Sequence, residues 1–318
     1  MERGKSPTTV ISELLVNNDI TTILHKLVET LRPEGIDGSI TLKELESTAT
    51  ILSMNLSKTA PYYGPFNNVS RILRDIASLA ADKDSILYGK TLLHIWSCLV
   101  DALYAYTNRS LAHVKRTCMN LDTDKLLVHN YGNLTYSCLL GLREKNPMIF
   151  ITGTNPKNLA RKLVQAGYNP RKLVIVPVYY SYQASHLVDT YIFQAETVSV
   201  ERMLSRPGVQ LTANYIAKTR TDARIIPLTL SLAYITTRGK GLINYTNIMK
   251  MPYELEWKEI EQLPLFEIVY IKELADKLTL LDEQGQARIR TTEYRRRLSN
   301  AHRRILELVD ARCRVFQS

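Results

Sequence analysis

Residues 125–134 read KLLVHNYGNL, and this stretch decides the fold that the sequence predicts. Leu126, Leu127 and Val128 form a short apolar run that is typical of a buried strand. The polar residues and the glycine that follow indicate a turn. In an α/β sheet, ligands bind at the turn after a strand's carboxyl end. The candidate ligand residues of this turn are His129, Asn130, Tyr131 and Gly132.

The pattern of this first run is repeated along the second half of the chain. Helical segments such as 158–166 separate the apolar runs. Strands that alternate with helices predict βαβ units and a parallel sheet. We therefore expect an α/β fold, with a Rossmann-like domain over residues 125–285. The further runs lie at 148–152, 172–178, 190–195 and 224–230.

The chain in front of the sheet has a different pattern. Residues 1–124 carry apolar side chains three and four positions apart, which predicts an N-terminal α-helical domain. Residues 91–120 also have this pattern. Because that stretch is longer than an ordinary helix, we expect it to be broken.

The end of the chain is rich in arginine. Residues 286–318 contain nine arginines and three acidic residues, and Leu298, Ile305 and Val309 fall at helical spacing. This pattern predicts a basic C-terminal helix. Its arginine side chains can contact phosphates of RNA or an acidic protein surface. Alternatively, it is a solvated helix that packs its stripe of Leu298 and Ile305 on its own domain. The candidate contact residues are Arg288, Arg290, Arg295, Arg296, Arg297, Arg303 and Arg304.

Composition narrows the class of protein. The 318 residues carry a net charge of +10, and a basic chain attracts polyanions and acidic partners. No apolar run reaches the roughly 18 residues of a membrane span, and the first residues lack an apolar export signal. We therefore expect a cytoplasmic protein without a membrane segment. The four cysteines form no metal pattern, so we expect buried free thiols, and no metal or cofactor.

Five stretches stand in the order and at the spacing of motifs in one family. The family comprises the α, β and δ regulatory subunits of translation initiation factor 2B, with the ribose-1,5-bisphosphate and methylthioribose-1-phosphate isomerases as relatives. The resemblance implies a helical domain, a Rossmann-like domain and homodimers formed through the latter, near Tyr179, Tyr180 and Tyr182. The stretches are NRSLAHVKRTC (108–118), DKLLVHNYG (124–132), FITGTNP (150–156), VDTYIFQAE (188–196) and PLFEIVYIKELADKL (264–278).

The positions that the resemblance links to catalysis are altered. Isomerisation of an aldose phosphate needs an acid/base pair and donors for the phosphate. The family's cysteine is replaced by Asn130, whose amide cannot form a thiolate. The acidic partner is kept as Glu196, which non-catalytic members also have. The family's NKxGT segment is replaced by SRPGV at 205–209, and its RPT loop has no counterpart near 61–68. We therefore expect no catalytic residues.

The hypothesis that follows is a non-catalytic protein that binds an initiation factor, an RNA or a ribosomal subunit and so regulates translation. One alternative is a sugar-phosphate isomerase that uses Glu196. Another is a dimer that senses a phosphosugar or a nucleotide through the altered pocket. The ligand-pocket candidates are His129, Asn130, Tyr131, Gly132, Thr152, Glu196 and Arg206.

Overall fold

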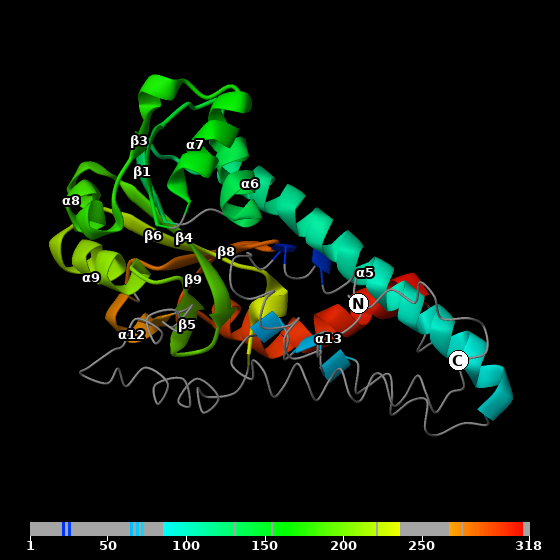
Figure 1. Cartoon of the computed structure of the whole chain (residues 1–318). Helices are drawn as coiled ribbons and strands as arrows, with labels where there is room; N and C mark the ends of the chain where they lie inside the picture. Colours follow the sequence, from blue (N-terminus) through cyan, green and yellow to red (C-terminus); the bar gives the residue numbers. More distant parts are fainter. Residues whose placement is uncertain are drawn as a thin grey trace, which may run out of the picture. The chain divides into compact units, whose positions relative to one another are not determined.

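The apolar runs of the sequence form one mostly parallel sheet (Figure 1). Its strand order is β3-β2-β1-β4-β6-β8-β9, and only the pairing of β8 with β9 is antiparallel. All nine residues of β4 are buried, because helices cover both faces of a parallel sheet. The strands are β1 (Lys125–His129), β2 (Met148–Thr152), β3 (Leu173–Ile175), β4 (Thr190–Val198), β6 (Arg224–Leu228), β8 (Thr279–Asp282) and β9 (Gly285–Arg288).

This computed structural model describes residues 85–129, 132–153, 155–220, 222–235, 267–274 and 276–313, and a few short helical pieces between 21 and 72. Most of the predicted N-terminal helical domain lies outside these residues, as do Asn130 and Tyr131. The chain divides into two compact units, residues 1–109 with 300–318 and residues 110–299. The second unit contains the sheet.

Helices connect the parallel strands. Figure 1 shows α6 and α7 on one side of the sheet and α8 and α9 on the other. The expected α/β fold is confirmed. The helices are α6 (Asn133–Leu142), α7 (Pro156–Gln165), α8 (Ser181–Ala184), α9 (Val209–Thr219) and α12 (Ile271–Leu274). The 3-10 turns are η1 (Pro170–Lys172), η2 (Val178–Tyr180), η3 (Ser185–Leu187) and η4 (Ser231–Ala233).

A small antiparallel sheet extends from β4 and was not predicted. Strand β5 (Arg202–Ser205) pairs with both β4 and β7 (Glu267–Tyr270). The pairing of β4 with β5 is irregular between Ala195 and Thr197, so Glu196 lies at a β-bulge. Bulges re-aim a side chain and are frequent beside active sites.

The helix that precedes the sheet, α5 (Ser85–Met119), is continuous. The expected break within residues 91–120 is therefore wrong. The sequence contains no proline or glycine between 91 and 119, so no residue there interrupts the helical hydrogen bonds. The Thr107 and Thr117 hydroxyls donate to carbonyls four residues earlier, which satisfies these polar groups within the helix.

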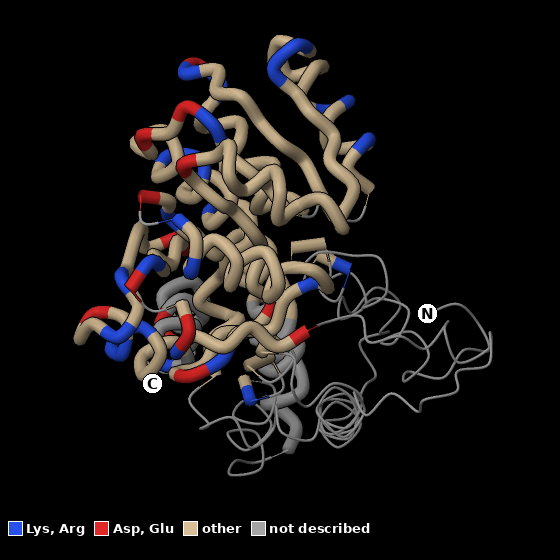
Figure 2. Tube along the Cα trace, turned by 90° about the vertical axis from the view of Figure 1, so that its left-hand side faces the viewer, with Lys and Arg blue, Asp and Glu red and all other residues tan. Residues whose placement is uncertain are grey.

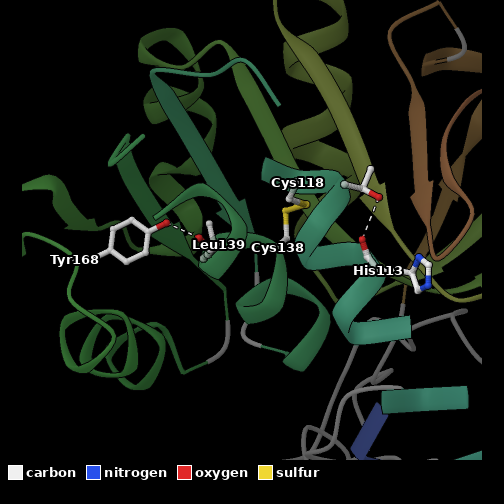
Figure 3. Close-up of a disulfide and its surroundings, with 6 residues drawn as sticks. His113, Cys118, Cys138, Leu139 and Tyr168 are labelled. Carbon is white, nitrogen blue, oxygen red and sulfur yellow. Dashed lines mark hydrogen bonds between the residues drawn. A yellow bond between two sulfur atoms is a disulfide. The ribbon is translucent and has the colours of Figure 1, made fainter. Parts of the chain in front are cut away.

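A disulfide joins α5 to α6. The Sγ atoms of Cys118 and Cys138 are 2.21 Å apart, and Figure 3 shows the bond between the two helices. The expectation of free thiols is wrong, since the described residues contain no free cysteine. The helices also approach closely at Gly141, where an added Cβ would lie 2.2 Å from the Lys115 carbonyl oxygen. The disulfide and the glycine together fix how α6 packs on α5.

Candidate functional site

The polar residues predicted from the strand ends do gather at the carboxyl edge of the sheet. His129 ends β1 and is the register partner of Thr152, which ends β2. Glu196 lies near the end of β4, the strand on the other side of β1. The connections change direction between β1 and β4, which is where open α/β sheets bind ligands. Gly132 precedes α6, and its carbonyl accepts a hydrogen bond from the Tyr136 amide at 2.8 Å.

His129 is held in one protonation state by its neighbours. Its Nε2 lies 3.1 Å from the Pro207 carbonyl oxygen and its Nδ1 lies 3.1 Å from the Tyr191 hydroxyl. Since a carbonyl can only accept, Nε2 carries the proton and the Tyr191 hydroxyl donates to Nδ1. Burial lowers the pKa of His129 to about 4. The imidazole is therefore neutral near pH 7 and serves to join β1 to the loop before α9.

Glu196 is a buried carboxylate with two polar neighbours. Its side chain is 1% exposed, and Gln194 Nε2 donates to Oε1 at 2.9 Å. Arg206 Nε lies 3.8 Å from the same oxygen. A buried carboxylate is tolerated when a cation and hydrogen bonds offset its desolvation. Glu196 and Arg206, two of the predicted pocket residues, thus lie side by side.

The amino end of α9 is occupied by a carboxylate that the sequence reading did not assign. Glu267 accepts hydrogen bonds from the backbone N–H groups of Gly208 at 3.0 Å and Gln210 at 2.5 Å. Burial raises the pKa of Glu267, although these N–H groups favour the charged form. A helix amino end attracts anions, and here the anion belongs to the protein. Glu267 stands in the PLFE motif, but a motif letter alone does not indicate this contact.

The segment Arg206–Gly208 is consequently held from three sides. Arg206 faces Glu196, the Pro207 carbonyl accepts from His129, and the Gly208 amide donates to Glu267. Gly208 has φ +96°, a conformation that favours glycine. An added Cβ there would lie 3.0 Å from His129 Cε1. The segment that replaces NKxGT is therefore a packed structural element.

The arginine-rich end departs from the prediction at its start. Helix α13 spans Thr292–Cys313, and Arg288 lies in strand β9 instead. Residues 286–290 alternate between exposed and buried, which is the two-residue period of a strand and not of a helix. Arg290 lies in the turn between β9 and α13, with φ +67°. The prediction of one helix over residues 286–318 is thus wrong for these two arginines.

Arg297 is buried and is not available to a partner. Its inclusion among the predicted contact residues is therefore wrong. Its side chain is 6% exposed, and its Nη1 lies 2.6 Å from the buried Asp282 carboxylate. The same nitrogen donates to the Gly285 carbonyl at 3.0 Å, and Nε donates to Glu293 at 2.8 Å. The Tyr234 hydroxyl also donates to Asp282. Arg297 therefore anchors α13 to the β8–β9 hairpin.

The other arginines that begin this region point outward. Figure 2 shows the distribution of basic and acidic residues along the chain. Arg296 pairs with Glu293 at 2.6 Å and Arg303 with Glu307 at 3.4 Å, both on the helix surface. The side chain of Arg304 lies outside the described residues. The exposed predicted contact residues are Arg288, Arg290, Arg295, Arg296 and Arg303.

Two further observations concern the described residues only. Among them, no helix is long and apolar enough to cross a membrane. In the same part of the chain, no group of three or more His, Cys, Asp or Glu side chains is arranged to hold a metal ion.

These features define a Rossmann-like α/β protein. The carboxyl edge of its sheet is where such folds bind ligands, and here the charged side chains of Glu196 and Arg206 contact each other. No protein-family model matches the chain, and no curated protein matches its sequence. Solved structures do match. The tetrameric eIF2B-beta2-delta2 complex from C. thermophilum contains a chain with a TM-score of 0.65 and 14% identity, over 95% of this chain and 96% of that chain.

Two other solved structures have the same fold. The translation initiation factor eIF-2B of Pyrococcus horikoshii OT3 gives a TM-score of 0.63 at 12% identity, over 91% of this chain and 99% of that one. The 5-methylthioribose 1-phosphate isomerase of the same organism gives 0.60 at 11%, over 94% and 88%. The chain has the fold that initiation factor 2B subunits and this isomerase share, which confirms the sequence resemblance at the level of the fold.

Proposed function

We propose that this protein is a non-catalytic relative of the initiation factor 2B subunits, which binds a component of the translation machinery through exposed arginines. One observation carries the proposal. Of the five arginines between 288 and 297, only Arg297 is buried, and the other four are exposed even where they make a contact at the surface, as Arg296 does with Glu293. A structural role explains a buried arginine, whereas exposed arginines favour contact with phosphates or carboxylates.

The contacts at the strand edge support the absence of catalysis. His129 is neutral and bonded on both ring nitrogens, Glu196 is buried beside Arg206, and Glu267 occupies the helix end where a substrate phosphate would be attracted. An acid/base pair must reach its substrate and titrate near the working pH. The pKa of His129 is about 4, far from a neutral working pH, and the carboxylates of Glu196 and Glu267 are each bonded to groups of the protein.

We further propose that the protein forms a homodimer through its Rossmann-like domain. Large apolar side chains are exposed on the segments around α8 and α9, and a cluster of this kind marks a protein interface. Tyrosine in particular is enriched at such interfaces. The C. thermophilum structure with the same fold is a tetrameric complex. The exposed side chains are Val178, Tyr179, Tyr180, Leu187 and Leu211.

The test is binding of ribosomal subunits, purified initiation factors and fluorescent RNA in a salt series from about 50 to about 300 mM. The test variant changes Arg288, Arg290, Arg295 and Arg296 to glutamine. If these arginines contact RNA phosphates, the dependence of log affinity on log salt becomes shallower by about 0.7 per lost contact on a single strand.

A control variant with the same loss of charge distinguishes a located surface from net charge. It changes four exposed cations on other elements of the same unit to glutamine. Equal losses in both variants, or binding by neither the parent nor the variants, would overturn the proposal. The control positions are Lys115, Arg116, Lys157 and Arg171.

The alternative function is an aldose–ketose isomerase, or a sensor for a related phosphosugar or nucleotide. The observation in its favour is that Thr152 Oγ1 and Gln194 Oε1 are buried at the strand edge without a hydrogen-bond partner in the described structure. Buried polar atoms of this kind often belong to functional sites. The test is turnover of methylthioribose 1-phosphate followed by NMR. Product formation that disappears in Glu196→Gln would establish the isomerase and overturn the non-catalytic proposal.

A further inference from the structure

Three segments that are far apart in sequence meet beside the exposed arginines. The segments are the β4–β5 turn (199–202), the junction of β7 with α12 (270–273) and the junction of β9 with α13 (288–296). The Tyr294 hydroxyl donates to the Ser199 carbonyl at 2.6 Å. The Ile271 amide donates to the Glu201 carbonyl at 3.0 Å. These bonds join the second and third segments to the first.

The third segment also contacts the second directly. Arg290 Nη2 donates to the Lys272 carbonyl at 3.3 Å. The three segments therefore form one surface of the unit 110–299, which we call the three-segment surface. All of its contacts lie within that unit.

Cations outnumber carboxylates on the three-segment surface. It has three carboxylates, Glu201, Glu273 and Glu293. Glu293 pairs with Arg296, so that carboxylate and that cation offset each other, and Glu273 accepts a hydrogen bond from the Asn214 amide at 2.9 Å. A surface with this balance attracts a polyanion. Apart from the buried Arg297, its cations are Arg202, Lys272, Arg288, Arg290, Arg295 and Arg296.

An aromatic side chain lies among these cations. Tyr270 is 38% exposed and is the register partner of Arg202. The Arg202 guanidinium lies over the Tyr270 ring, 5.5 Å from its centroid. An exposed ring that is supported by an arginine, on a surface rich in cations, can stack an unpaired base, and single-strand binding surfaces combine these features.

Arg290 adds an observation about the backbone. Its φ of +67° lies in the left-handed region, which favours glycine and disfavours a residue with a Cβ. The turn therefore carries an arginine where glycine would be conformationally preferred. Such residues are found where a side chain has a functional role.

We propose that the three-segment surface binds single-stranded RNA, with a base stacked on Tyr270 and phosphates bound by Arg288, Arg290, Arg295 and Arg296. This inference rests on the proposed function and names the kind of translation component that is bound. A purely acidic protein partner would use the cations but has no need of an exposed ring beside them. A duplex keeps its bases stacked inside, so only an unpaired strand can use Tyr270.

The first experiment tests stacking on the full chain by fluorescence anisotropy, with a single-stranded RNA and a duplex RNA of equal length. In Tyr270→Leu, we expect affinity for the single strand to fall about five- to hundredfold, which is the range for loss of one base–aromatic stack. The salt dependence should not change, because tyrosine is uncharged. Tyr270→Phe keeps the ring and should bind within about twofold of the parent. Duplex affinity should be equal in all three proteins.

Tyr104→Leu is the matched control, since Tyr104 is also an exposed tyrosine, 45% exposed, but lies on α5, outside the three-segment surface. If Tyr270→Leu and Tyr104→Leu behave alike, stacking on Tyr270 is overturned. Binding that still depends on the four arginines would leave the proposed function in place in that case. Failure of the parent to bind any single strand would overturn the RNA inference itself.

A second variant removes a phosphate contact without threatening the fold. Arg290→Gly replaces a residue with φ +67° by the residue that adopts this conformation most readily. The loss of the exposed hydrogen bond to the Lys272 carbonyl offsets part of that gain, so we expect thermal stability close to that of the parent. Single-strand affinity should fall, and the salt dependence should become shallower by about 0.7. Unchanged affinity in this well-folded variant would contradict the assignment of Arg290 to the RNA surface.

Discussion

Arg297 is assigned to a buried ion pair and Arg296 to the exposed surface, and replacing each side chain in turn tests this assignment. Arg297→Met leaves the buried Asp282 carboxylate without its cation and removes the hydrogen bond to the Gly285 carbonyl. Breaking a buried ion pair by deleting one partner costs about 3–5 kcal/mol. Arg296 is 65% exposed and pairs with Glu293 on the surface, so Arg296→Met should cost less than about 1 kcal/mol.

The assay is urea unfolding at pH 7, followed by circular dichroism. With a denaturant dependence of about 2–3 kcal/mol per molar, the midpoint of Arg297→Met should fall by roughly 1–2 M, and that of Arg296→Met should scarcely move. Adding Asp282→Asn to Arg297→Met removes both charges and should restore part of the loss. Equal midpoints for the two single variants would refute the inward assignment of Arg297.

The two variants should rank in the opposite order for RNA binding, with the larger loss of affinity in Arg296→Met. Arg296→Met should weaken single-strand binding and make its salt dependence shallower, because the side chain faces solvent. Arg297→Met, measured well below its unfolding midpoint, should keep the salt dependence of the parent. If the salt dependence became shallower in Arg297→Met and not in Arg296→Met, the phosphate contact would belong to Arg297, which would contradict this account.

Three further predictions concern the sheet edge and the disulfide. Gly208→Ala should destabilise the protein by several kcal/mol in thermal unfolding, because its Cβ would lie 2.9 Å from Val178 Cγ1 in addition to the cost of φ +96°. Gly167→Ala, at φ +94° with no atom within 4 Å, should cost only about 1 kcal/mol, and equal losses would exclude the close contact. His129 has a folded-state pKa of about 4 against 6.5 unfolded, so its share of stability, about 3 kcal/mol, is present above pH 6.5 and is lost as the pH falls towards 4. His129→Asn should lack that part of the pH dependence in urea midpoints, and an identical profile would contradict the pKa. Reduction of the Cys118–Cys138 bond, 20 residues apart, should lower the free energy of unfolding by about 3 kcal/mol, whereas an unchanged melting temperature would show that the bond adds nothing.

The central strands could be predicted because they are buried on both faces and therefore have mostly apolar sequences. Both faces of the parallel sheet are covered, so the run from 190 to 195 is apolar or aromatic except for Thr190 and Gln194. The strands β5, β7, β8 and β9 are only four residues each, and β9 has the sequence GQAR, which has no apolar run at all. Pairing with a neighbouring strand, as in the β8–β9 hairpin, and not local composition, makes these segments extended.

The candidate site could be predicted only in part, for a related reason. Strand ends point to a common edge, so the sequence placed His129, Thr152 and Glu196 there. The role of Glu267 depends on a contact made across more than fifty residues, with Gly208 and Gln210. No local pattern records such a contact.

The arginines and the cysteines show the same limit. Five arginines within ten residues look equivalent in the sequence, but helical geometry and the buried Asp282 turn Arg297 inward. Likewise, the spacing of Cys118 and Cys138 does not reveal that α5 and α6 pack side by side. In both cases the tertiary partner decides what the residue does.

The most direct test of the central claim is to locate bound RNA on the protein. A single-stranded RNA that contains 4-thiouridine would be crosslinked by ultraviolet light to the full chain, and the modified peptides identified by mass spectrometry. We expect crosslinks at Tyr270 and in residues 288–296, and their loss in the variant with Arg288, Arg290, Arg295 and Arg296 changed to glutamine. Crosslinks confined to the strand edge around Gly132, Thr152 and Arg206, or spread evenly over the chain, would contradict the three-segment surface as the RNA site.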